Sequence, residues 1–104
     1  MKIKRGDTLS FIVVKKDSKG VPVTGQDIKS HVRDINKKVA EFIVKETDVP
    51  GSYEFTIPAS VTKTFPIKKL YFDIRFEKDG VVETSPTVEL EVEASKTYDD
   101  SRNN

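Results

Sequence analysis

The stretch LYFDIRFEKDGVVET, residues 70–84, determines the class of fold. Its apolar set is Leu70, Phe72, Ile74 and Phe76, whereas Asp73, Arg75 and Glu77 take the other face. Alternation with a period of two is typical of a strand that has one face on a core and the other in water. The dipeptide Asp79-Gly80 comes next and favours a tight turn between two strands. The stretch therefore predicts a β-hairpin.

Three further stretches show the same alternation. Their apolar sets are Leu9, Phe11 and Val13; Tyr53, Phe55 and Ile57; and Val88, Leu90 and Val92. PASVTKTFP, residues 58–66, is bracketed by prolines and predicts a crossover that holds at most one short helical turn. We therefore expect an all-β chain: a single antiparallel β-sandwich domain of about seven to eight strands over residues 1–95, followed by a flexible polar tail over residues 96–104.

Residues 26–45 fit two structures. Ile28, Val32, Ile35, Val39 and Phe42 recur at the spacing of a helical stripe. Two strands, 27–34 and 38–45, joined by a turn at INKK, fit the same residues. The neighbouring strands and the β-branched and aromatic residues of EFIVKET favour the two strands.

The composition of the chain excludes several classes of partner. The chain has 104 residues, of which 36% are hydrophobic, and its 18 basic and 17 acidic residues leave a net charge of +1. This balance gives no field that would attract nucleic acid or an anionic membrane, and the basic residues are not interleaved with exposed aromatic ones. There is no cysteine, no apolar run of membrane-spanning length and no apolar signal-peptide segment. We expect synthesis in a cytoplasm, with neither nucleic acid nor membrane as a partner.

Candidate catalytic and metal-binding residues are few. His31 is the only histidine, Asp73 and Glu77 stand two residues either side of Arg75, and Glu89, Glu91 and Glu93 alternate along the last strand. Acid–base catalysis would need a desolvated carboxyl group, and a calcium cage would need carboxylates closer together than alternate strand residues are. A charged outer sheet face, with the glutamates on an edge strand, explains them better. We expect no enzyme, no cofactor and no metal site.

The tripeptide Arg5-Gly6-Asp7 invites comparison with adhesion signals. It leads directly into the alternation that begins at Leu9, whereas an adhesion signal needs a protruding loop. Glycine can supply a bend and Asp7 can accept backbone N–H groups, so a turn is favoured.

The order of several short motifs resembles that of a known family. These motifs are KRGDTLSF, KDSKGVPVTGQDI, HVRD, GSYEFTIPASVT and LYFDIRFEKDGVVET. Together, over about residues 4–93, they are similar to the immunoglobulin-like N-terminal domain of the baseplate upper protein family of tailed bacteriophages and to related small tail proteins. SPTVEL departs from the glycine often found before the last strand. The resemblance implies an immunoglobulin-like sandwich in a bacteriophage or prophage virion, made in the bacterial cytoplasm, with a structural role. It implies other tail and baseplate proteins, or copies of itself, as partners.

Two other functions are compatible with the sequence. One is a binding module that recognises a protein or carbohydrate through loops 15–26, 46–51 and 78–80, and the other is a small phage-encoded inhibitor of a host protein. For the structural role, the candidate interface residues are Ile12 and Val14, on the second face of the first strand, and Tyr71, on the second face of LYFDIRF. We expect these three side chains either to form an apolar patch on adjacent strands or to close a second layer of the core.

Overall fold

The computed structural model describes residues 1–97, which form eleven strands and one short helix. These are β1 (Lys2–Lys4), β2 (Leu9–Val14), β3 (Asp27–Lys29), β4 (His31–Asp34), β5 (Lys37–Glu41), β6 (Ile43–Glu46), β7 (Ser52–Ile57), α1 (Ala59–Thr62), β8 (Lys69–Phe72), β9 (Arg75–Lys78), β10 (Val81–Thr84) and β11 (Val88–Glu93). The all-β prediction is confirmed, as is the single helical turn within residues 58–66. The predicted number of about seven to eight strands is wrong, because short interruptions divide several extended stretches of residues 1–97 into two strands each. The predicted tail lies outside the described residues, apart from Lys96 and Thr97.

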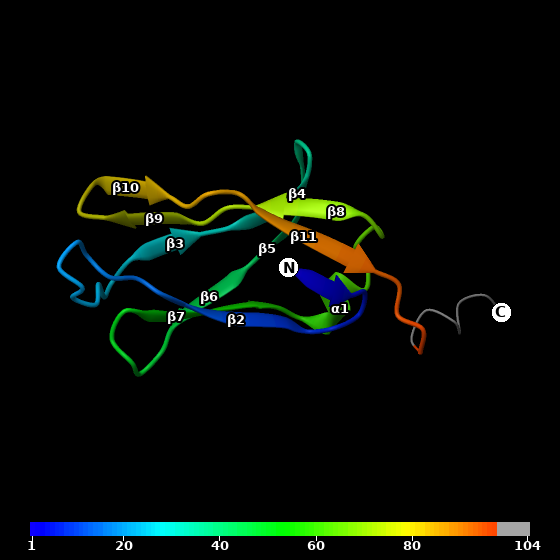
Figure 1. The fold of residues 1–104 in the computed structure, drawn as a ribbon, viewed down its shortest axis with the longest axis horizontal. Helices are drawn as coiled ribbons and strands as arrows, with labels where there is room; N and C mark the ends of the chain where they lie inside the picture. The colour runs from blue at the N-terminus through cyan, green and yellow to red at the C-terminus, as the bar shows by residue number, and fades with distance from the viewer. Residues whose placement is uncertain (98–104) are drawn as a thin grey trace.

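Several neighbouring strands are two parts of one extended stretch of chain (Figure 1). Only Ser30 separates β3 from β4, only Phe42 separates β5 from β6, and two residues separate β8 from β9. The segment 26–45 therefore forms strands, and the helical alternative is wrong. Its turn is the pair Ile35-Asn36, with Asp34 opposite Lys37.

The strands belong to three sheets, which make two layers. The orders are β1-β11-β8-β4-β5, β10-β9-β3 and β2-β7-β6. The first two sheets join end to end, because β3 runs into β4 and β8 runs into β9; we call the joined sheets the long layer (Figure 1). The β2-β7-β6 sheet is the second layer, and the β5–β6 stretch passes from one layer to the other.

The core lies between these layers and is centred on phenylalanine rings. Phe11 on β2 stacks on Phe55 of β7, with ring centroids 5.2 Å apart, and on Phe72 of the long layer at 6.0 Å. Phe42, at the crossing between β5 and β6, meets Phe72 edge-on at 5.0 Å. The apolar faces predicted for the alternating strands all point into this core, including Ile74. Aromatic pairs of this geometry stabilise a core beyond their buried area alone.

Two serine side chains bridge the junction within the long layer. Ser30 Oγ donates a hydrogen bond to the carbonyl oxygen of Asp73 at 2.7 Å, and Ser85 Oγ accepts one from the Ile74 N–H at 2.9 Å. The Ser85 N–H in turn donates to the Ile74 carbonyl at 2.8 Å. Hydroxyl groups therefore satisfy backbone groups where the regular ladder stops.

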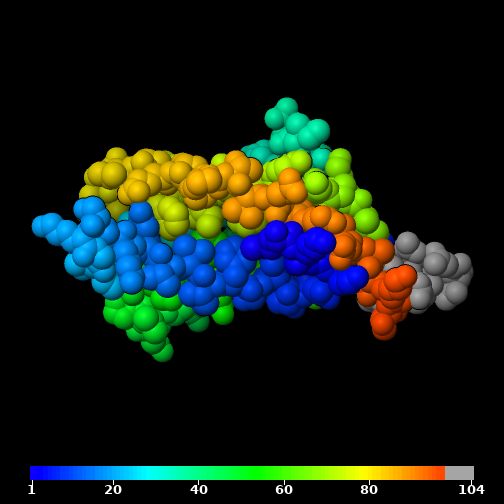
Figure 2. Space-filling view, viewed as in Figure 1, coloured from blue at the N-terminus to red at the C-terminus, as the bar shows by residue number. Residues whose placement is uncertain are grey.

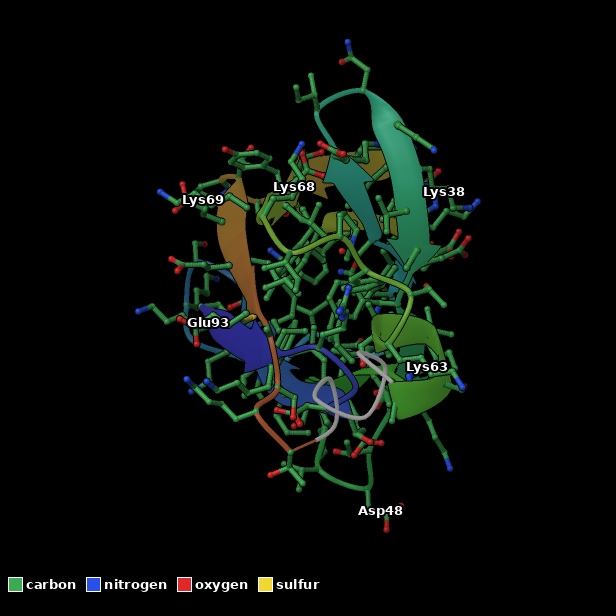
Figure 3. The ribbon with its side chains drawn as sticks, turned by 90° about the vertical axis from the view of Figure 1, so that its right-hand side faces the viewer. Lys38, Asp48, Lys63, Lys68, Lys69 and Glu93 are labelled. Carbon is green, nitrogen blue, oxygen red and sulfur yellow. The ribbon has the colours of Figure 1, made fainter. Side chains whose placement is uncertain are left out.

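One strand pair departs from the predicted antiparallel arrangement. β1 runs parallel to β11, with Lys2 opposite Glu91 and Lys4 opposite Glu93. The prediction that the glutamates of β11 lie on an edge strand is also wrong, because β11 lies between β1 and β8. Lysines on both neighbouring strands offset the acidic row: Lys4 lies 3.6 Å from Glu93, and Lys69 lies 3.4 Å from Glu89. Of these side chains, Lys69 and Glu93 project outward from the sheet (Figure 3).

Two predicted turns are confirmed, one near the N-terminus and one in the hairpin of residues 70–84. Gly6 has a φ of 95°, the Asp7 N–H donates to the Lys4 carbonyl, and the Asp7 carboxylate accepts the Lys4 N–H at 3.3 Å. Arg5-Gly6-Asp7 therefore forms the turn between β1 and β2. Asp79 and Gly80, with φ values of 52° and 80°, join β9 to β10.

Candidate functional site

The predicted interface residues lie in different layers. Ile12 and Val14 are on β2, with exposed fractions of 52% and 54%, whereas Tyr71 is on β8, with 36% exposed. The expectation of one patch on adjacent strands is wrong, because β2 pairs with β7 and β8 pairs with β11 and β4. The alternative, that all three close a second layer of the core, is also wrong, because all three are exposed.

A third exposed apolar residue accompanies Ile12 and Val14. In the second layer Ile12 lies opposite Glu54, and Ile43 of β6 lies opposite Thr56. Glu54 and Thr56 are two residues apart on β7, so all these side chains point to the same side of the sheet. We call the side that carries Ile12, Val14 and Ile43 the outer face of the second layer. Ile43 is 61% exposed, and the sequence analysis missed it.

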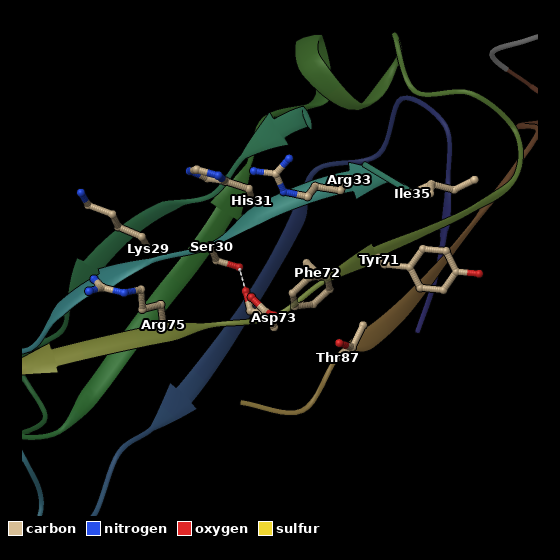
Figure 4. A pocket seen from close by; sticks show the side chains of 10 residues that line it. All are labelled: Lys29, Ser30, His31, Arg33, Ile35, Tyr71, Phe72, Asp73, Arg75 and Thr87. Atoms are coloured by element: carbon tan, nitrogen blue, oxygen red, sulfur yellow. Dashed lines mark hydrogen bonds between the residues drawn. The ribbon is translucent and has the colours of Figure 1, made fainter. Parts of the chain in front are cut away.

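Tyr71 borders a groove on the outside of the long layer (Figure 4). The groove has a volume of about 420 Å³ and lies where β3 meets β4 and β8 meets β9. Its lining residues are Lys29, Ser30, His31, Arg33, Ile35, Tyr71, Phe72, Asp73, Arg75 and Thr87. Cationic side chains outnumber the one carboxylate.

Neighbouring acceptors already bind most of these cationic side chains. Arg75 lies 2.9 Å from Glu77, His31 Nε2 lies 3.5 Å from Glu41 Oε1, and Arg33 donates to the Asn36 carbonyl at 3.2 Å. Within residues 1–97, Lys29 has no ion-pair partner.

Glu41 also binds Lys38, beside the groove. Lys38 Nζ donates to Glu41 Oε1 at 2.8 Å, and this hydrogen bond is the main cause that lowers the pKa of the Glu41 carboxyl. The Lys38 and His31 charges lower it further. These interactions fit a solvated charged face.

The three loops of the binding-module alternative lie together at one end of the molecule, the left end in Figure 2. The Lys15 N–H donates to the Gly51 carbonyl at 2.7 Å, which joins loops 15–26 and 46–51. Lys78 Nζ donates to the Thr24 carbonyl at 2.7 Å, which joins the 78–80 turn to the first loop. We call this region the loop end.

A hollow of about 490 Å³ lies at the loop end. Lys15 borders it, with Nζ 3.0 Å from Glu83 Oε2 and 5.3 Å from the centre of the Phe76 ring. Gln26 also borders it, and its Oε1 is buried with no hydrogen-bond partner among residues 1–97. The adjacent Tyr53 hydroxyl donates to the Val23 carbonyl at 2.8 Å and accepts the Gln26 N–H. The hollow therefore has polar groups held in fixed positions.

No protein-family profile matches the chain, and no curated protein matches it. Among residues 1–97, no helix is both long and apolar enough to cross a membrane. Over the same residues, no group of three or more acidic or histidine side chains is placed to hold a metal ion.

Proposed function

We propose that the protein is a non-catalytic structural component of a bacteriophage or prophage tail, associated with the baseplate. In this proposal the two layers are an immunoglobulin-like β-sandwich that works through protein–protein contacts. The order of the sequence motifs supports the family, and the all-β, two-layered structure is compatible with it. The proposed location is the virion, after synthesis in the bacterial cytoplasm.

The main support for a role in assembly comes from the outer face of the second layer. Its apolar residues Ile12, Val14 and Ile43 are all more than half exposed. Glu54 and Lys45 lie opposite each other on the same face and provide polar groups beside the apolar ones. Apolar residues together with charged neighbours are typical of contact surfaces between proteins. We assign the contact with other tail proteins to this face.

The test is incorporation into phage particles of a variant that combines Ile12→Asp and Ile43→Asp. Because both side chains are exposed, we expect the variant to fold but to be lost from purified tails. Tyr71→Asp, at an exposed residue of the other layer, is the matched control and should be incorporated. Normal incorporation of the folded double variant would contradict the proposal.

The gathering of loops 15–26, 46–51 and 78–80 at the loop end favours a second candidate, an immunoglobulin-like binding module for a protein or carbohydrate. Val21→Asp distinguishes the two functions, because Val21 is an exposed residue of the first loop. If the loop end is the binding site, Val21→Asp should abolish binding, whereas Ile12→Asp should leave it intact. If the protein is a tail component that uses the outer face of the second layer, Ile12→Asp should weaken the contact with other tail proteins and Val21→Asp should leave it intact.

A further inference from the structure

β10 is an open edge of the long layer. It pairs with β9, and all its residues from Val81 to Thr84 are exposed. In Figure 1 it lies along the upper left border of the molecule, and within residues 1–97 no strand lies beyond it. An open edge presents backbone donors and acceptors to any strand that approaches it.

The hairpin determines which backbone groups of β10 are free. Lys78 and Val81 flank the two-residue turn, and such a pair is hydrogen-bonded, so bonded pairs alternate along the ladder. The bond from the Ser85 N–H to the Ile74 carbonyl follows the same alternation. The N–H and C=O groups of Val82 and Thr84 therefore point away from β9.

The other edges of the long layer carry charges that oppose pairing. β1 carries Lys2 and Lys4, β3 carries Asp27 and Lys29, and β5 carries Lys37, Lys38 and Glu41. Lysine on an edge strand hinders strand addition because the approaching strand would bury its charge. β10 instead presents Val82, which is 47% exposed, between the free backbone groups.

We propose that β10 pairs antiparallel with β10 of a second copy of this chain, so that the two long layers form one continuous sheet. An antiparallel edge is complementary to itself under a two-fold rotation, and the arrangement closes at two copies. Placing Val82 opposite Thr84 of the second copy uses every outward backbone group of both residues. This contact goes beyond the proposed tail function and does not depend on it.

The same register brings Glu83 opposite Glu83 of the second copy. Like charges at such positions are destabilising. Lys15 lies 3.0 Å from Glu83, so each copy brings a cation that offsets its own glutamate. The register is therefore compatible with the charges at this edge.

The test is sedimentation velocity of the purified chain over roughly 10–500 µM, the range in which a small contact of this kind would be populated. We expect the unmodified chain to shift from monomer to dimer as concentration rises. Val82→Pro removes the outward N–H without removing a bond to β9, and Val82→Lys adds an edge charge; both should stay monomeric. Val49→Lys, at an exposed valine of loop 46–51, is the matched control and should dimerise.

Amide hydrogen exchange locates the contact. The Val82 and Thr84 amides should exchange more slowly at high protein concentration, whereas the Glu83 amide, which faces Phe76, should be protected at all concentrations. A chain that is monomeric throughout would overturn the proposal. So would a dimer that persists in both Val82 variants, or one that Ile12→Asp abolishes while Val82 stays unprotected. None of these outcomes alters the expected incorporation into tails, which is measured separately.

Discussion

The Ser30 hydroxyl donates a 2.7 Å hydrogen bond to the carbonyl oxygen of Asp73, where the two parts of the long layer meet. Ser30 is itself buried, and its carbonyl accepts the N–H of Phe42 at the crossing between layers. One small residue therefore connects three extended stretches of chain.

Ser30→Ala should lower the free energy of unfolding by about 1–2 kcal/mol, because the Asp73 carbonyl loses its side-chain donor in a partly buried position. Urea unfolding measures the change. Ser10→Ala, at an exposed position of β2, is the control and should be nearly neutral. Equal effects of the two substitutions would show that the bridge does not stabilise the fold.

Phe72→Ala should lower the free energy of unfolding by about 3–5 kcal/mol, because Phe72 is buried and contacts two other phenylalanine rings. Asp73→Ala, on the next residue, should cost less than about 1 kcal/mol, because its side chain is exposed. Chemical denaturation of both variants gives the comparison. Similar midpoints would contradict the assignment of the two faces.

Gly51→Ala should destabilise the chain more than Gly25→Ala. Both glycines have positive φ, 77° and 68°, so both substitutions carry backbone strain of about 1–2 kcal/mol. At Gly51 an added Cβ would also lie 2.8 Å from the Lys15 carbonyl oxygen and 2.8 Å from Pro22 Cβ, whereas nothing lies within 4 Å at Gly25. Thermal unfolding should place the Gly51 variant lower, and the reverse order would contradict this packing of the loop end.

Ile35→Asn should raise the free energy of unfolding by up to about 1 kcal/mol. Ile35 has a φ of 57°, a conformation that β-branched residues rarely adopt and asparagine tolerates better. Its side chain is mostly exposed, so little packing is lost. Urea unfolding tests the prediction, with Ile43→Asn, in an extended strand, as the control that should not stabilise. A less stable Ile35 variant would show that contacts of this side chain outweigh the strain.

Lys38→Ala should raise the pKa of Glu41 toward its ordinary value of 4.5, because the Lys38 hydrogen bond is the main cause of its lowering. A lowered folded pKa means that Glu41 stabilises the fold above its unfolded pKa and that this contribution fades as pH falls through the folded pKa. The Glu41 side chain is exposed, so the effect is best read from its own titration by NMR. Lys37→Ala is the control, and an unchanged pKa in the Lys38 variant would contradict the assignment.

The sequence predicts the faces of the strands well. Phe72 and Ile74 lie in the core as their alternation indicates, and Asp79-Gly80 forms the expected turn. These features depend on residues close together in the chain. The exposure of Ile43 could also have been predicted from the alternation, since Ile43 falls between Phe42 and Val44, which both pack inward.

The order of the strands was not predictable in the same way. The pairing of Lys2 with Glu91 joins the two ends of the described chain, and no local pattern specifies it. The placement of Ile12 and Tyr71 in different layers depends on such distant pairings, as does the gathering of the loops at one end. Periodicity gives the side of a strand on which a residue lies, but it does not give the neighbour of that strand.

The parallel pairing of β1 with β11 determines how the domain would bear mechanical load. Force applied between Lys2 and Glu93 would pull two neighbouring parallel strands in opposite directions along their own axes. All hydrogen bonds between them would then be loaded at once in shear, whereas a hairpin pulled from its open end breaks its bonds one after another. The resistance of the domain to stretching along the chain would therefore depend on this short ladder giving way as a unit.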